Sequence, residues 1–160
     1  MITDTAQLQI LKAAIDVETD AEFVALRNSG ATGAMAAWYN VDSSTDAWMT
    51  NAIGRVIDEG ANYSTFDTIL AGKRDAWAIF LQYAPRDFSK NKNRKVVTDV
   101  WGNATASSVA ESILQACVEK ASRGELVFGS TNATTGTVTA VKRNWIGDIT
   151  NTDIINALAS

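Results

Sequence analysis

The sequence predicts a mainly α-helical fold, in which a bundle-like helical body carries a C-terminal extended or β-hairpin arm and a short terminal helix. Apolar residues recur at helical spacing between capping residues through residues 1–128. At residue 129 the composition changes to Gly, Ser, Thr and Asn, which favour turns and extended chain. The length of 160 residues, with 46% hydrophobic and 20% charged side chains, suits one globular domain. We therefore expect a body at residues 1–128 and an arm at residues 129–160, which packs on the body or on a neighbouring copy.

Three helices are expected within the first 40 residues. Asp4 has the chemistry of an N-cap, and Thr19 followed by Glu22 has the spacing of a capping box. Gly30 is typical of a helix end, and a polar loop is expected at residues 40–46. The inner faces of these helices would carry Leu8, Leu11, Ile15, Phe23, Leu26, Met35, Trp38 and Tyr39.

Two helices are expected before the only proline of the chain. A short helix around Ile57 would end at Gly60, and a longer helix would cover residues 65–83 with Trp77 on its inner face. Pro85 disfavours helical geometry at the residue before it, so the longer helix should break there.

Two further helices should follow the proline. Ser89 can cap the first of them, which would end at Gly102. Ser108 followed by Glu111 has capping-box spacing and opens the second, which can continue as far as Phe128.

The C-terminal segment has a different amino-acid composition. Residues 129–136 are a turn-rich linker, whereas residues 137–141 alternate β-branched side chains as a strand does. Residues 144–149 are expected to return as a second strand of a hairpin. Thr150 with Asp153, or Thr152 alone, would then cap a short terminal helix at residues 153–158.

Half of the positive charge of the chain lies in one short segment, which we call the basic block. The net charge is −4 and the isoelectric point about 4.8, yet seven of the fourteen Lys and Arg residues fall within residues 73–95. They are Lys73, Arg74, Arg86, Lys90, Lys92, Arg94 and Lys95. The last four lie at a predicted helix start, where positive charge opposes the helix dipole, so a neutralising partner is favoured. We expect an acidic protein surface as this partner; a solvated helix start and a phosphate-bearing partner are the alternatives.

Two of the five tryptophans are candidate interface residues. Trp48 and Trp145 lie in polar stretches, where aromatic side chains often anchor an interface, whereas Trp77 and Trp101 lie on apolar helix faces and are expected in the core. Stacking of these aromatic rings on single-stranded nucleic acid is an alternative, which the acidic balance of the chain disfavours.

Nothing in the sequence indicates catalysis. The chain has no histidine and one cysteine, which excludes His-based triads and leaves no Cys- or His-rich metal site. The neighbouring acids Asp58 and Glu59 are better explained as helix-end charges than as an acid–base pair. We therefore expect no enzyme activity, no cofactor and no bound metal. No secretory signal and no membrane span are expected, and a lone Cys117 suits a reducing cytoplasm.

The order of several short motifs resembles a family of proteins from tailed bacteriophages. The motifs are AAWYN at residues 36–40, DAWMTNAIGRVIDEG at 46–60, LAGKRDAWAIFL at 70–81, KNKNRKVVTDVWG at 90–102, ESILQACVEKASRGELVFG at 111–129 and TVTAVKRNWIGDITNTDIINAL at 137–158. Together they cover most of the chain, and their order carries the resemblance. The family comprises small head–tail connector proteins of the phage neck.

This resemblance implies a structural protein of the virion at the head–tail interface. Such connectors, or adaptors, are mainly helical and form dodecameric rings that dock on the portal protein and on an adjacent neck or tail protein, with arms reaching to neighbours. DNA would pass through the lumen without sequence-specific binding, and no membrane would be involved. A neck stopper or tail-completion protein is an alternative, as is a nucleic-acid-binding helical module that uses residues 90–95. Between copies, the positive charge around residues 90–95 would face the acidic stretch at residues 16–22 or at residues 58–59 and fix the register of the ring.

Overall fold

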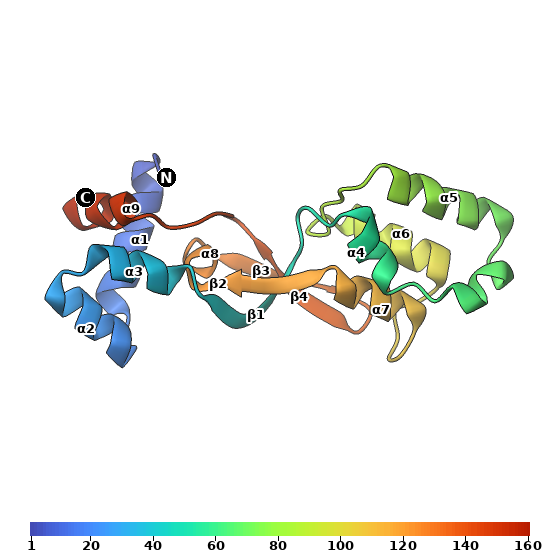
Figure 1. The fold of residues 1–160 in the computed structure, drawn as a ribbon, viewed down its shortest axis with the longest axis horizontal. Coiled ribbons are helices and arrows are strands. Elements are labelled where there is room, and N and C mark those ends of the chain that lie inside the picture. The colour runs from blue at the N-terminus through green and yellow to red at the C-terminus, as the bar shows by residue number, and fades with distance from the viewer. The chain divides into compact units, whose positions relative to one another are not determined.

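The computed structural model describes all 160 residues, and its fold is α+β rather than mainly α (Figure 1). Ten helices, which make up 54% of the chain, accompany a four-stranded mixed sheet. The expectation of a helical bundle with a β-hairpin arm is therefore wrong. The helices are α1 (Thr5–Val17), α2 (Ala21–Ser29), α3 (Thr32–Tyr39), α4 (Gly54–Glu59), the 3-10 helix η1 (Tyr63–Thr68), α5 (Ala71–Gln82), α6 (Asn91–Trp101), α7 (Val109–Ala116), α8 (Arg123–Val127) and α9 (Asn151–Ala159). The strands are β1 (Asp42–Trp48), β2 (Val118–Ser122), β3 (Ser130–Thr135) and β4 (Val138–Arg143).

The sheet uses two segments that were expected to be loops. Its strand order is β2-β1-β4-β3, and β1 runs parallel to β4 with Ala47 opposite Val141. β1 replaces the polar loop expected at residues 40–46, and β3 replaces most of the expected linker at residues 129–136. Both strands carry mostly polar, partly exposed side chains, so no apolar alternation marks them. β1 pairs with β2 and β4, which are distant in sequence, whereas β3 is an edge strand that pairs with β4 across a short turn. The strand expected at residues 144–149 does not form.

Two expected helices are interrupted. The helix expected at residues 65–83 consists of η1 and α5, separated at Ile69 and Leu70. The helix expected to continue to Phe128 ends at Ala116; the chain then forms β2 and restarts as α8 behind a capping box of Ser122 and Glu125. In both places one long stretch of apolar residues forms two or more elements. Helical periodicity alone does not show where one element ends and the next begins.

The helix caps agree better with the sequence. Asp4 and Ser108 are N-caps whose side chains accept backbone N–H bonds, and Thr150 with Asp153 forms a capping box at α9. Two caps were misplaced by one residue: Asp20 rather than Thr19 caps α2, and Lys90 rather than Ser89 precedes α6 without a side-chain cap. Each correction leaves the helix itself close to its expected place.

The chain divides into two compact units, which we describe separately. Unit 1 comprises Met1–Ser44, Lys120–Ser130 and Arg143–Ser160, and unit 2 comprises Thr45–Glu119 and Thr131–Lys142. Unit 1 holds nine acidic and five basic residues, whereas unit 2 holds nine of each. The net charge of −4 therefore belongs to unit 1.

Unit 1 is built around an aromatic cluster. Phe23 lies 4.7 Å from the ring of Trp38 and 5.2 Å from that of Tyr39, measured between centroids. The amide side chain of Asn40 donates to the carbonyl of Ile149 (2.9 Å) and accepts from its N–H (2.8 Å), which holds the segment before α9 against α3. Helices α1, α2, α3 and α9 thus share one core.

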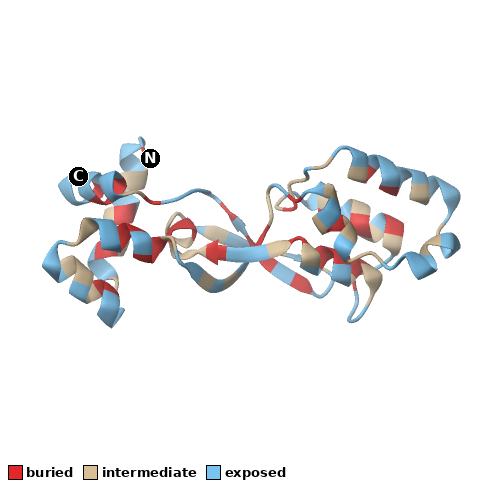
Figure 2. Cartoon of the chain, viewed as in Figure 1, coloured by how far each residue is buried: buried red, intermediate tan, exposed pale blue.

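Unit 2 has its own core, made by the inner faces of α4, α5, α6 and α7. Trp77 and Phe80 of α5 are buried there, as Figure 2 shows by the red inner side of this helix. The rings of Trp77 and Trp101 meet edge to face at 5.5 Å. The expectation of a core position is confirmed for Trp77, whereas Trp101 is half-buried and packs against this core; Cys117 is a buried free thiol as expected.

Candidate interaction surface

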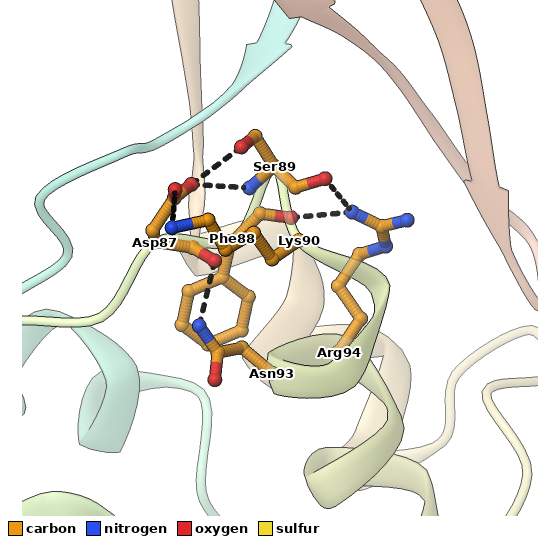
Figure 3. A network of polar contacts seen from close by, with 6 residues as sticks. All are labelled: Asp87, Phe88, Ser89, Lys90, Asn93 and Arg94. Carbon is orange, nitrogen blue, oxygen red and sulfur yellow. Dashed lines mark hydrogen bonds and ion pairs between the residues drawn. The ribbon is translucent and has the colours of Figure 1, made fainter.

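The start of α6 is a closed network of hydrogen bonds (Figure 3). Asp87 accepts from the N–H (3.0 Å) and the hydroxyl of Ser89 and forms an ion pair with Lys90 at 3.2 Å. The side chain of Asn93 donates to the carbonyl of Asp87 (2.7 Å). Burial by itself would raise the pKa of Asp87, but the hydrogen bonds from Ser89 and Lys90 more than offset it and lower this pKa below its usual value. The network therefore favours the ionised carboxylate.

Arg94 is part of the interior of unit 2. It is 4% exposed, and its guanidinium donates to the carbonyls of Phe88 and Ser89 and, over 2.9 Å, to the hydroxyl of Thr135. The same guanidinium lies 4.9 Å from the ring of Trp48. Five donors on a planar group allow Arg94 to tie α6, the preceding turn and β3 together.

Trp48 and Trp145, the two candidate anchors, lie in different surroundings. Trp48 is fully buried, and its indole N–H donates to the carbonyl of Ala133 (2.8 Å). Trp145 is half-buried in unit 1, with its ring 4.8 Å from that of Phe128. Neither ring stands free on the surface.

The other cations of the basic block divide into paired and unpaired ones. Arg74 pairs with Asp67 at 3.3 Å, and Lys95 pairs with Asp99 at 2.7 Å, one helical turn further along α6. Lys73, Arg86 and Lys92 form no ion pair in the structure. Of the seven cations in the basic block, only these three lack an ion pair and lie outside the fully buried interior.

Arg86 is held in place although it lacks an acidic partner. Its backbone exchanges two hydrogen bonds with Ala52, of 2.8 and 2.9 Å. Its Nε–H donates to the carbonyl of Phe80 (3.0 Å), and its guanidinium lies 4.7 Å from the Phe80 ring and 6.0 Å from the Tyr83 ring. The remaining guanidinium donors are therefore positioned in advance for an incoming acceptor.

Helix α5 also carries an exposed apolar stripe along the side that faces away from the core. Gly72, Ala76, Ile79 and Tyr83 follow one another at intervals of four, three and four residues, so they lie on one side of the helix, with Tyr83 at its C-cap. All four are exposed, Ile79 at 55% and Tyr83 at 66%. We call this stripe the α5 outer face. The sequence analysis did not identify it, although a second apolar period opposite Trp77 and Phe80 was visible.

Unit 1 carries an exposed surface of opposite charge where α1 passes into α2. Asp16, Glu18, Asp20 and Glu22 fall within seven residues, and the intervening Val17 is 73% exposed. We call these five residues the acidic corner. Glu18 accepts from the N–H groups of the two residues after it, and Asp20 caps α2. The side chains of Asp16 and Glu22 make no hydrogen bond or ion pair.

Unit 1 also contains a shallow hollow of about 380 Å³ beside Leu26, Trp38 and Arg123. The guanidinium of Arg123 covers the Trp38 ring at 4.1 Å, and the buried indole N–H of Trp38 has no acceptor.

No group of three or more potential metal-ligating side chains occurs in the structure, and none of its helices has the length and hydropathy of a membrane span. No protein-family model, curated protein or solved structure matches this chain.

Proposed function

We propose that this chain is a structural protein of a tailed-bacteriophage virion, a ring-forming head–tail connector that docks on the portal and forms part of the DNA passage. The order of the motifs from residue 36 to residue 158 supports this proposal. The observation that carries it is the α5 outer face with its two unpaired cations, on a chain whose other unit is acidic. One chain thus carries two exposed surfaces of opposite character, as a subunit that joins to its neighbours requires.

A protein partner explains the α5 outer face better than a nucleic acid does. Protein interfaces favour aromatic and aliphatic residues at the centre, with Arg at positions of high binding energy. Tyr83, Ile79 and the stacked Arg86 fit this composition. We therefore propose contacts with further copies and with the portal or an adjacent neck protein.

The acidic balance of unit 1 is consistent with a DNA passage. Each phosphate that a basic side chain neutralises adds to affinity, so a surface of net negative charge would let DNA slide without holding it. In this proposal the chain works as a mechanical and electrostatic part of the virion, with no catalytic step and no cofactor. A stopper or tail-completion role would use the same kind of surfaces at another level of the neck.

A nucleic-acid-binding module remains the second candidate, but it would have few free charges. Of the four cations at residues 90–95, Lys90 and Lys95 are paired and Arg94 is buried, which leaves Lys92. Binding through this segment would therefore neutralise few phosphates and would depend only weakly on salt.

The proposal is tested with the purified full-length chain and purified portal of the same phage. We expect ring-shaped particles with a central channel in electron micrographs, and a complex with the portal in sedimentation velocity at modest salt. A chain that stays monomeric at high concentration and does not bind the portal would contradict the proposal. Retention of short duplex DNA by that monomer, lost in Lys92→Glu, would instead favour the second candidate.

A further inference from the structure

We propose that the α5 outer face of one copy binds the acidic corner of the next copy. This inference rests on the proposed ring-forming function and names the two surfaces that would meet. It also replaces the expectation that residues 90–95 make the contact, because the charges at the start of α6 are used within the chain.

The α5 outer face is an apolar surface without a partner inside its own unit. Trp77 and Phe80 already satisfy the packing of α5 against the core, and the opposite side leaves Ile79 and Tyr83 more than half exposed. Leu70, immediately before the helix, is 73% exposed. Single exposed apolar residues are ordinary, but several on one helix, with a cation at each end, mark an interaction site.

Gly72 leaves room for a close neighbour at the first turn of α5. A Cβ at this position would meet no atom within 4 Å, and the backbone has no positive φ that would require glycine. By contrast, a Cβ at Gly60 would come within 2.4 Å of the backbone of α7, so that glycine serves the fold. Gly33 in α3 is as open as Gly72, so glycine alone does not mark an interface. Gly72 differs in lying beside the exposed apolar residues of α5, where a partner could approach the backbone closely.

Two unpaired cations flank the apolar stripe. Lys73 lies in the first turn of α5 and forms no ion pair. Arg86 lies beyond the other end of the helix, where its backbone is bonded to Ala52 and its guanidinium stacks beside Tyr83. Because Arg86 is already ordered, pairing with an incoming carboxylate would cost little further side-chain entropy.

The acidic corner has the complementary composition. It places exposed Val17 among four carboxylates, two of which, Asp16 and Glu22, are unpaired. Apolar contact would form between Val17 and the α5 outer face, and the carboxylates would face Lys73 and Arg86 at its two ends. There they would lie away from Asp75, which is exposed one helical turn before Ile79. The two surfaces differ, so their contact is heterologous and links copies head to tail, the arrangement from which closed rings are built.

The first test compares two glycines at equivalent helix positions, of which only Gly72 lies on the α5 outer face. Gly72 and Gly33 are both the second residue of a helix, and a Cβ at either meets nothing within 4 Å. We expect Gly72→Gln to weaken self-association of the full-length chain about tenfold or more in sedimentation velocity, with no loss of thermal stability. Gly33→Gln should associate as the wild type does.

The second test exchanges charges and does not depend on steric effects. Lys73→Glu should weaken self-association about tenfold, whereas Lys92→Glu, at an exposed unpaired cation outside the proposed surface, should leave it unchanged. Adding Asp16→Lys and Glu22→Lys to the Lys73→Glu chain should restore part of the lost affinity. Recovery in the combined variant identifies the acidic corner as the partner, because it needs both surfaces.

The outcomes separate this inference from the proposed function. If the wild type forms rings and Gly72→Gln and Lys73→Glu form them equally well, the inference is wrong and the connector function stands. The same holds if Gly33→Gln or Lys92→Glu weakens association as much as its counterpart, or if the charge exchange restores nothing. A wild type that neither self-associates nor binds the portal overturns the proposed function and the inference together.

Discussion

The two halves of the basic block differ in what their charges do. At the start of α6, Arg94 is buried under three hydrogen bonds and stabilises the fold, whereas Lys90 and Lys95 are exposed and each pairs with a carboxylate of its own chain. Beside α5, Lys73 and Arg86 have no carboxylate and border exposed apolar side chains. A local excess of charge in a sequence therefore does not measure the charge that is free for a partner. Backbone carbonyls can satisfy the hydrogen-bond donors of a buried cation without a carboxylate, and composition does not reveal this.

The largest expected effect of this difference is at Arg94. Arg94→Ala would remove three hydrogen bonds and leave the carbonyls of Phe88 and Ser89 buried without a donor. We expect a loss of about 3 kcal/mol in the free energy of unfolding, measured by urea denaturation. Lys92→Ala, two residues away and exposed, should change it by less than about 0.5 kcal/mol. Equal small effects of both substitutions would remove the distinction between the two halves.

The next expected effect is at Asp87, which organises the same turn. Asp87→Asn would remove the ion pair with Lys90 and weaken the bonds from Ser89, at a cost of about 1 kcal/mol. The pKa of Asp87 is lower in the folded state, so its contribution is present above the unfolded value of about 3.9. It is lost as the pH falls through the lower pKa of the folded state. Wild type and Asp87→Asn should therefore differ in stability at pH 7, and the difference should shrink as the pH falls through the lowered pKa of Asp87, as thermal melts at a series of pH values would measure.

The sequence predicts those features whose interacting residues lie close together along the chain. N-caps are local, and Asp4, Ser108 and Thr150 were recognised because a polar side chain and its target lie within three residues. Strands β1 and β3 lack such a local signal. β1 reads DSSTDAW and is a strand because it pairs with β2 and β4, which are remote in sequence. β3 reads STNATT and pairs with the adjacent β4, but its polar sequence carries no apolar alternation that would mark it as a strand.

The same limit applies to the candidate surface. The sequence located the basic block but not the burial of Arg94, whose acceptor Thr135 is 41 residues away. It placed Trp48 among polar residues, whereas the acceptor of its indole N–H lies 85 residues away in β3. The α5 outer face could have been found, since its four residues follow a helical period opposite Trp77. The buried residues of the same helix, Trp77 and Phe80, give the stronger hydrophobic signal.

A smaller effect on stability, but a large one on association, is expected at Tyr83. Tyr83→Ser removes a ring that is 66% exposed and should change the free energy of unfolding by less than about 0.5 kcal/mol. If the ring anchors an interface, the same substitution should reduce self-association about tenfold or more. Sedimentation velocity and urea denaturation of one preparation measure both quantities. A matched change at exposed Ile146 in unit 1, Ile146→Ser, should affect neither; equal association of the two variants would count against the α5 outer face.

The smallest structural change, one methyl group at Gly72, gives the most specific prediction. Gly72→Ala adds one methyl group in open space and restricts the unfolded chain, so the free energy of unfolding should rise by about 0.5 kcal/mol. Gly33→Ala should give the same gain, because that position is equally open and equally placed in its helix. Gly72→Ala should then self-associate more weakly than Gly33→Ala, since only at Gly72 would the methyl group enter a contact between copies. A chain that is more stable yet associates less would separate folding from assembly at a single atom. Equal association of both alanine variants with the wild type would mean that no backbone approaches α5 at this turn.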